Sequence, residues 1–177
     1  MLAALALLVM GTATACSKKE VLPTREGLPV KVGGLDYTVF ITRELNPRDT
    51  EDRDYIPQVD AGTGYAFFGV FIQVCNTHHS GATRIPVGDF KIVDTQGNTY
   101  SPSPLPSTNI FAYRPAPLAP RQCIPVAGST AAGAPTGGAL LLFRLPVSAI
   151  ENRPMDLEIA PPATGVSPKR QRIELDI

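Results

Sequence analysis

The side chains with the widest chemical repertoire in this chain are two histidines, three cysteines and a run of carboxylates. His78 and His79 are adjacent and follow Cys75 closely, so one interpretation is a copper or zinc site made of imidazole and thiolate. However, neighbouring side chains of an extended segment point apart and rarely bind one metal ion. We therefore favour an exposed polar turn and assign no metal ligand to these residues.

A second group of candidate ligands lies in the segment 46–63. Its charged residues are Asp49, Glu51, Asp52, Asp54 and Asp60, interleaved with Arg48 and Arg53. Oxygen-rich clusters can hold Ca²⁺, but this spacing lacks the Asp-x-Asp-x-Asp-Gly pattern, and the arginines offset much of the charge. A solvated loop is the favoured interpretation, and an extracytoplasmic protein that binds copper, zinc or calcium is the alternative function.

Motifs of catalysis and cofactor binding are missing from the sequence. It has no Gly-x-Ser-x-Gly, no P-loop and no dinucleotide fingerprint, so we expect no enzyme, no catalytic residue and no cofactor. The chain carries 16 Lys+Arg and 16 Asp+Glu, which gives a formal net charge of zero. This balance argues against a nucleic-acid partner, because proteins that bind nucleic acids usually present a basic face.

The first fifteen residues have the form of an export signal. No charge precedes Lys18, and the apolar run Leu2–Met10 is shorter than the roughly 20 residues of a membrane-spanning helix. The small residues Ala13-Thr14-Ala15 stand before Cys16, and this arrangement resembles the lipobox of bacterial lipoproteins. The resemblance implies removal of residues 1–15, acylation of Cys16 and anchoring of the chain to a membrane from its extracytoplasmic side.

The signal departs from the usual lipobox in two ways. Ala13 stands where leucine is commoner, and no lysine or arginine precedes the apolar run. We expect translation to start upstream of Met1 and to supply the missing basic residues. Residues 16–27 are polar and of mixed charge, and we predict that they form a flexible tether. The alternative is a cleaved signal that leaves Cys16 as a free thiol.

An odd number of cysteines in an exported chain requires an explanation. If Cys16 carries lipid, Cys75 and Cys123 remain, and export places them where a disulfide persists. Cys75 ends a strongly apolar run, and Cys123 lies in a proline-rich segment, so a bridge between them pins a long loop to a strand. We predict this disulfide; the alternative is two buried thiols.

The rest of the chain, residues 28–177, predicts strands and turns. The expected strands are 37–42, 65–75, 90–93, 99–100, 139–145, 155–159 and 172–177. Segment 65–75 is apolar on both faces, with Phe68 and Val70 on one side and Phe67 and Phe71 on the other, which is typical of a central strand. Short strands spaced by turn signals predict an all-β, antiparallel, immunoglobulin-like sandwich of about seven strands.

Residues 102–138 interrupt this pattern with a long segment rich in Pro, Gly, Ala and Ser. A loop of this length is uncommon in a compact domain and is usually functional, mobile or tied down. We expect Ile110, Phe111 and Tyr113 to be its apolar anchors and favour their packing beneath the loop. In the alternative, the aromatic side chains are exposed beside a polyproline surface that binds a partner.

Four segments carry a family resemblance. They are the strand Tyr37–Thr42, the strand Gly69–Cys75 ending in Asn76, the pattern Phe-x-Ile-x-Asp-x-x-Gly-x-x-Tyr over Phe90–Tyr100, and Phe143-Arg144-Leu145-Pro146. Together they resemble the DUF4352 group of bacterial extracytoplasmic domains, which often occur on lipoproteins. The resemblance implies an immunoglobulin-like sandwich outside the cytoplasm and supplies no catalytic residues.

We therefore expect a membrane-anchored, non-enzymatic interaction module of the cell envelope. Its partners are expected to be the membrane, through the lipid, and another envelope protein or a cell-wall polymer. The segments 46–63 and 102–138 are the candidate contact surfaces, because loops on a rigid sandwich carry variable function.

Overall fold

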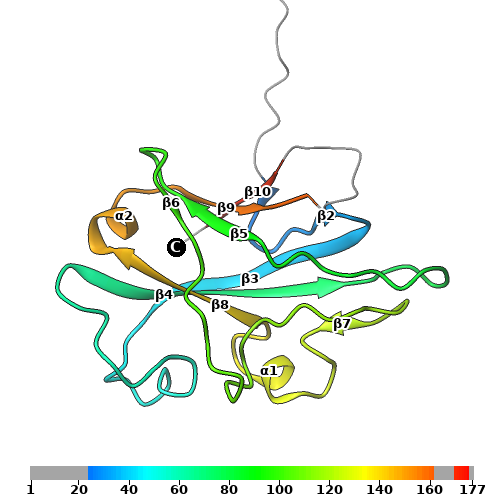
Figure 1. The fold of residues 1–177 in the computed structure, drawn as a ribbon, viewed down its shortest axis with the longest axis horizontal. Helices are drawn as coiled ribbons and strands as arrows, with labels where there is room; N and C mark the ends of the chain where they lie inside the picture. Colours follow the sequence, from blue (N-terminus) through cyan, green and yellow to red (C-terminus); the bar gives the residue numbers. More distant parts are fainter. Residues whose placement is uncertain (1–23, 162–169, 176–177) are drawn as a thin grey trace, which may run out of the picture.

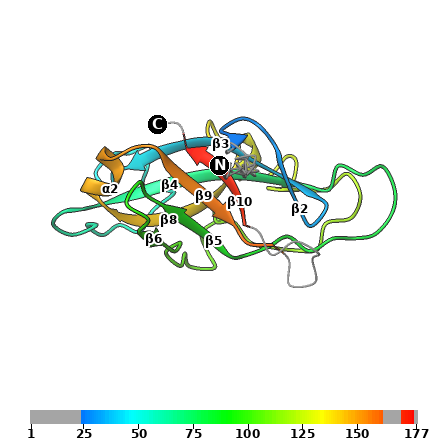
Figure 2. The same cartoon turned by 90° about the horizontal axis from the view of Figure 1, so that it is seen from above.

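The computed structural model describes residues 24–161 and 170–175, where two β-sheets face each other across a common core (Figures 1 and 2). The expected signal peptide, residues 1–15, and Cys16 lie outside the described residues. The strands are β1 (Thr24–Arg25), β2 (Val30–Val32), β3 (Leu35–Leu45), β4 (Tyr65–Cys75), β5 (Phe90–Val93), β6 (Thr99–Tyr100), β7 (Cys123–Ile124), β8 (Ala139–Pro146), β9 (Met155–Ile159) and β10 (Gln171–Leu175). Two short helices, α1 (Thr130–Gly133) and α2 (Val147–Glu151), complete the described elements.

The strands form an antiparallel sandwich, which confirms the predicted fold class. Sheet A has the order β1-β10-β9-β5-β6, and the short β1–β10 pair is its one parallel contact among the described strands. Sheet B has the order β2-β3-β4, and the far edge of β4 pairs first with β8 and then with β7. Because β1 begins at Thr24, part of the segment 16–27 expected to be a tether already belongs to the sandwich.

Strand β4 is the centre of the molecule, as its sequence predicts. It pairs with β3 on one side and with β8 and β7 on the other. Phe68 and Val70 point into the inner core between the sheets, whereas Phe67 and Phe71 belong to an outer core on the opposite face of sheet B. The sandwich therefore needs a third layer to keep water from the outer face of sheet B, and that layer consists of loops.

Strand β3 changes the face it buries halfway along its length. Its register with β4 shifts between Val39 and Ile41, which marks a β-bulge. Before the shift, Val39 is fully buried in the inner core; after it, Leu45 lies in the outer core. The bulge leaves Phe40 and Ile41 with 42% and 39% of their surface exposed.

The pattern from Phe90 to Tyr100 builds a closed hairpin around Asp94, which is 8% exposed. Its carboxylate accepts hydrogen bonds from the amides of Gln96 and Asn98, the side chain of Asn98 and the hydroxyl of Tyr100. Gly97 has φ +82°, a conformation that favours glycine. Desolvation opposes ionisation of the carboxyl group, but these hydrogen bonds outweigh it and lower the pKa of Asp94.

The outer face of sheet A carries an ion-pair network instead of apolar side chains. Arg172 lies 2.7 Å from Glu158 and 3.6 Å from Asp156. Arg170 pairs with Asp89 and Glu158, and Arg25 pairs with Glu174. Asp156 and Glu174 stand directly opposite each other on β9 and β10, where two like charges repel. Desolvation, together with the charges of Glu174 and Glu158, outweighs the attraction of Arg172 and raises the pKa of Asp156.

This raised pKa predicts that Asp156→Asn stabilises the protein at pH 7, by less than about 1 kcal/mol because the site is partly hydrated. At pH 7 the carboxylate is ionised in both states, and its ionisation costs more in the folded one. As the pH falls through the raised pKa, the folded state takes up a proton and the advantage of the amide variant disappears. Urea unfolding at pH 7 and pH 3 measures the difference.

The control is Glu158→Gln on the same face. Glu158 lies opposite Lys91 and contacts Arg172, so this change should lower the free energy of unfolding at pH 7. Equal destabilisation by Asp156→Asn and Glu158→Gln would contradict the prediction.

Candidate functional site

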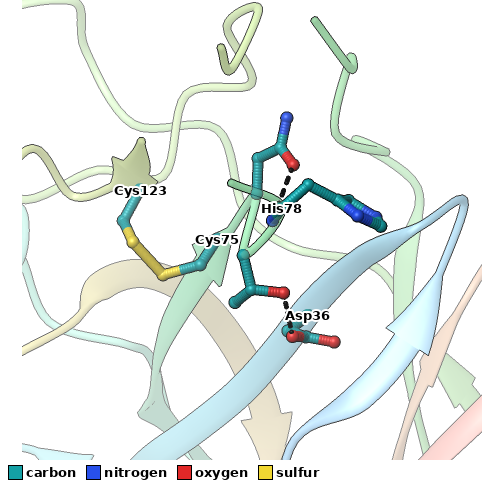
Figure 3. Close-up of a disulfide and its surroundings, with 6 residues drawn as sticks. Asp36, Cys75, His78 and Cys123 are labelled. Carbon is teal, nitrogen blue, oxygen red and sulfur yellow. Dashed lines mark hydrogen bonds between the residues drawn. A yellow bond between two sulfur atoms is a disulfide. The ribbon is translucent and has the colours of Figure 1, made fainter. Parts of the chain in front are cut away.

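The predicted disulfide is present at one end of the sandwich (Figure 3). Cys75, the last residue of β4, lies directly opposite Cys123 of β7, with the two Cα atoms 4.1 Å apart. The bridge joins positions 48 residues apart and fastens the end of the 102–138 segment to the central strand. Both cysteines are half-buried.

Asn76, which follows the disulfide, is fully buried and connects the two loops at this end. Its side chain donates to the carbonyl oxygens of Ala82 and Leu118 and accepts from the amide of His78. Its backbone pairs with Gln122 and Arg121. Asn76 thus satisfies polar groups of residues 76–89 and of residues 118–122 at the same time. The sequence analysis identified Asn76 only as the residue at the end of a strand and did not predict these contacts.

Two tyrosines hold the next part of this loop. The hydroxyl of Tyr37 accepts a hydrogen bond from the amide of Val87, and the hydroxyl of Tyr113 donates to the carbonyl oxygen of the same residue. The ring of Phe90 lies between them, 6.3 Å from Tyr37 and 5.3 Å from Tyr113. Burial raises the pKa of both hydroxyls, that of Tyr37 to about 12, so the Tyr113 hydroxyl keeps the proton that it donates to Val87.

The two histidines lie at this end without forming a metal site. The imidazole of His78 points away from the disulfide (Figure 3), and Nδ1 of His79 is 3.0 Å from Nη2 of Arg121. The sulfur of Cys75 is in the disulfide and is not a thiolate ligand. Across residues 24–161 and 170–175, no group of three His, Cys, Asp or Glu side chains is placed to hold a metal ion.

Asp36 lies beside the histidine turn and is held by neighbouring donors. Lys31 donates to one of its oxygens, and the hydroxyl of Thr77 donates to the other at 2.7 Å. Burial opposes ionisation of the carboxyl group, but these hydrogen bonds outweigh it and lower the pKa of Asp36. Asp36 therefore ties the β2–β3 hairpin to the end of β4.

The carboxylates of the 46–63 segment serve separate local contacts. Asp52 is 3% exposed, pairs with Arg43 and accepts a hydrogen bond from the amide of Asn46. The side chains of Asp49 and Asp60 accept from amides two residues further along, those of Glu51 and Gly62. Each of these three carboxylates thus accepts hydrogen bonds from its own part of the loop.

Both predicted contact loops are folded onto the outer face of sheet B. Tyr55 of the first loop meets Phe71 of β4 edge-on at 5.1 Å and Phe111 of the second loop at 4.6 Å. Phe111 is 7% exposed and Tyr113 is half-buried, so these two anchors lie where the sequence predicted. The expectation for Ile110 was wrong, because its side chain is 63% exposed on the turn before Phe111.

The second loop also covers the outer edge of β8. The amides of Ser103 and Tyr113 donate to the carbonyl oxygens of Leu142 and Leu140, and the amide of Leu140 donates to Phe111. These bonds replace a neighbouring strand.

A cleft of about 420 Å³ opens where the two loops meet β3. Ile41 and Arg43 come from β3, Glu51 and Tyr55 from the first loop, and Pro135 and Thr136 from the second. No pattern in the sequence indicated this cleft, because the bulge that turns Ile41 outward is not visible in the order of residues.

The described part of the chain contains no helix long and apolar enough to cross a membrane.

Comparisons with known proteins leave the family open. No family model and no curated protein matches the chain. Among solved structures, an uncharacterized β-sandwich protein from Clostridium difficile 630 is similar, with 13% identity and a TM-score of 0.46 over 90% of this chain and 99% of that one. This likeness carries no inference about activity.

The contacts of Asn76 predict that Asn76→Leu lowers the free energy of unfolding by about 3 kcal/mol, because it leaves buried carbonyl groups without a donor. Urea unfolding measures the loss, and hydrogen exchange should show Arg84 and Leu118 opening first. Asn46→Leu is the matched control, since Asn46 is exposed. A loss below about 1 kcal/mol for Asn76→Leu would show that the loops do not depend on it.

Removal of the disulfide should also lower the free energy of unfolding. The double change Cys75→Ser and Cys123→Ser frees the loop between positions 48 residues apart and should cost about 4 kcal/mol in the chain-entropy model. Chemical unfolding with and without reductant checks it. Reductant should destabilise the unchanged protein and leave the double variant unaffected; equal sensitivity of both would contradict the role of the bridge.

Proposed function

We propose that this chain is a membrane-anchored lipoprotein whose sandwich is a non-enzymatic interaction module of the cell envelope. The partner is another envelope protein or a cell-wall polymer. The lipobox-like residues before Cys16, the resemblance to DUF4352 domains and a disulfide that suits an oxidising compartment support the proposal.

The observation that carries it is the position of the loop layer relative to the chain entry. The described chain enters sheet A at Thr24, whereas the two loops cover the opposite, outer face of sheet B (Figure 1). Cys16 is eight positions before Thr24, so a fully extended tether reaches at most about 28 Å. An anchor at Cys16 would hold the entry to sheet A within this distance of the membrane, and the loop layer lies on the face of the sandwich away from that entry.

The metal-binding alternative gains no support from the geometry. Its sulfur ligand is in a disulfide, and three of its carboxylates serve local turns. The loop layer is therefore the surface on which a search for a partner should begin.

Intact mass spectrometry of the protein from host membranes tests the anchor. We expect a chain that begins at Cys16, carries added acyl mass and gains two hydrogens on reduction. The variant Cys16→Ala should carry no acyl mass, while Cys123→Ser should still carry it. Acyl mass on Cys16→Ala, or an unmodified Cys16 in the unchanged protein, would contradict the proposal.

A further inference from the structure

The outer face of β3 exposes two large apolar side chains side by side. Phe40 and Ile41 are the residues at the bulge, and both are about two-fifths exposed. A β-bulge is a common means of turning a side chain toward a binding site. Further along this face, Arg43 is one-third exposed and pairs with Asp52, and Leu45 is buried in the outer core.

The cleft beside Ile41 has the form of a pocket for one large side chain. Ile41, Pro135 and the ring of Tyr55 provide apolar walls, and Thr136 is buried within hydrogen-bonding range of the Tyr55 hydroxyl. Phe40 lies against Gly137, where a Cβ atom would come within 3.3 Å of its ring. The aromatic side chain thus extends the apolar surface beyond the cleft. Pockets of this kind hold the buried anchor residues of protein interfaces.

The charge at the rim of the cleft is negative. The guanidinium of Arg43 is neutralised by the buried carboxylate of Asp52. Glu51 is exposed on the rim, and no ion pair to it occurs among the described residues. A positive group next to the bound side chain would therefore lie close to the complementary negative charge of Glu51.

We propose that this cleft binds an extended segment of a partner protein, which inserts one large apolar side chain beside Ile41 and places an adjacent Lys or Arg next to Glu51. The inference rests on the proposed function, since it names the chemistry of the partner of that module. It selects a protein over a wall polymer, because an apolar anchor with a basic neighbour is a feature of a polypeptide.

The binding test uses capped tetrapeptides with Trp-Lys, Trp-Glu or Ala-Lys at the centre. The protein contains no tryptophan, so the fluorescence of the two tryptophan peptides reports their binding directly, and the Ala-Lys peptide is measured by its competition with Trp-Lys. The full chain carries Cys16→Ala to avoid lipid and detergent. We expect the Trp-Lys peptide to bind about tenfold more tightly than either of the others.

Variants of the protein then distinguish binding at the cleft from nonspecific binding to other exposed apolar side chains. Ile41→Ser should weaken binding of the Trp-Lys peptide about tenfold, and Glu51→Lys should reverse the preference toward Trp-Glu. Ile85→Ser is the matched control, because Ile85 is 73% exposed and lies outside the cleft. Equal binding of Trp-Lys and Trp-Glu, or an equal effect of Ile41→Ser and Ile85→Ser, would overturn the inference.

Crosslinking in the host distinguishes failure of the cleft from failure of the module. A photoreactive amino acid is placed at Phe40, Ile85 or Ile110, and the crosslinked partner segment is sequenced. A segment with an apolar residue next to Lys or Arg, captured from Phe40 alone, supports the inference. Capture through position 110 alone, or capture of a second copy of this chain through position 40, contradicts the cleft proposal. Either result remains compatible with the proposed interaction module. No capture from any position counts against both.

Discussion

The structure depends on burying both faces of one strand. β4 presents large apolar side chains to each side of its sheet, and a two-layer sandwich covers only one of them. Sheet A covers the inner face, and the loops 46–63 and 102–138 cover the other. The long irregular segments are therefore required by the core, because without them Phe67 and Phe71 would face water. This requirement explains why segments that look variable in sequence carry buried anchors such as Tyr55 and Phe111.

The disulfide and Asn76 solve the complementary problem of fastening the 102–138 loop, together with the loop 76–89, at the end of β4. Apolar anchors hold a loop against a face but leave its backbone groups to find partners. At the end of β4, the side chain of Asn76 serves two loops at once, and the bridge between Cys75 and Cys123 limits how far they separate. Further along, the 102–138 loop meets the 46–63 loop and borders the cleft against β3.

Local patterns in the sequence predicted much of this. β4, β5, β6 and β9 have the predicted bounds, and the pairing of Cys75 with Cys123 is confirmed. The hairpin around Asp94 could be anticipated because its turn chemistry lies within eleven residues. The bulge at Phe40 and the cleft could not, because both depend on register between strands and on loops distant in sequence. The exposure of Ile110 was missed for a related reason: apolarity does not show which of two neighbours turns inward.

The proline-rich cover on β8 has a consequence for molecules held at high density on a surface. Confinement to a plane brings identical domains into repeated lateral encounters, and an open strand edge is a template for polymerisation. Here that edge already bonds to Ser103, Phe111 and Tyr113. The covering segment carries Pro102, Pro104, Pro106 and Pro115, which have no amide hydrogen to offer a neighbouring chain. Sheet B is thus shielded along this side from lateral growth, and a crowded layer of such domains can remain a layer of separate molecules.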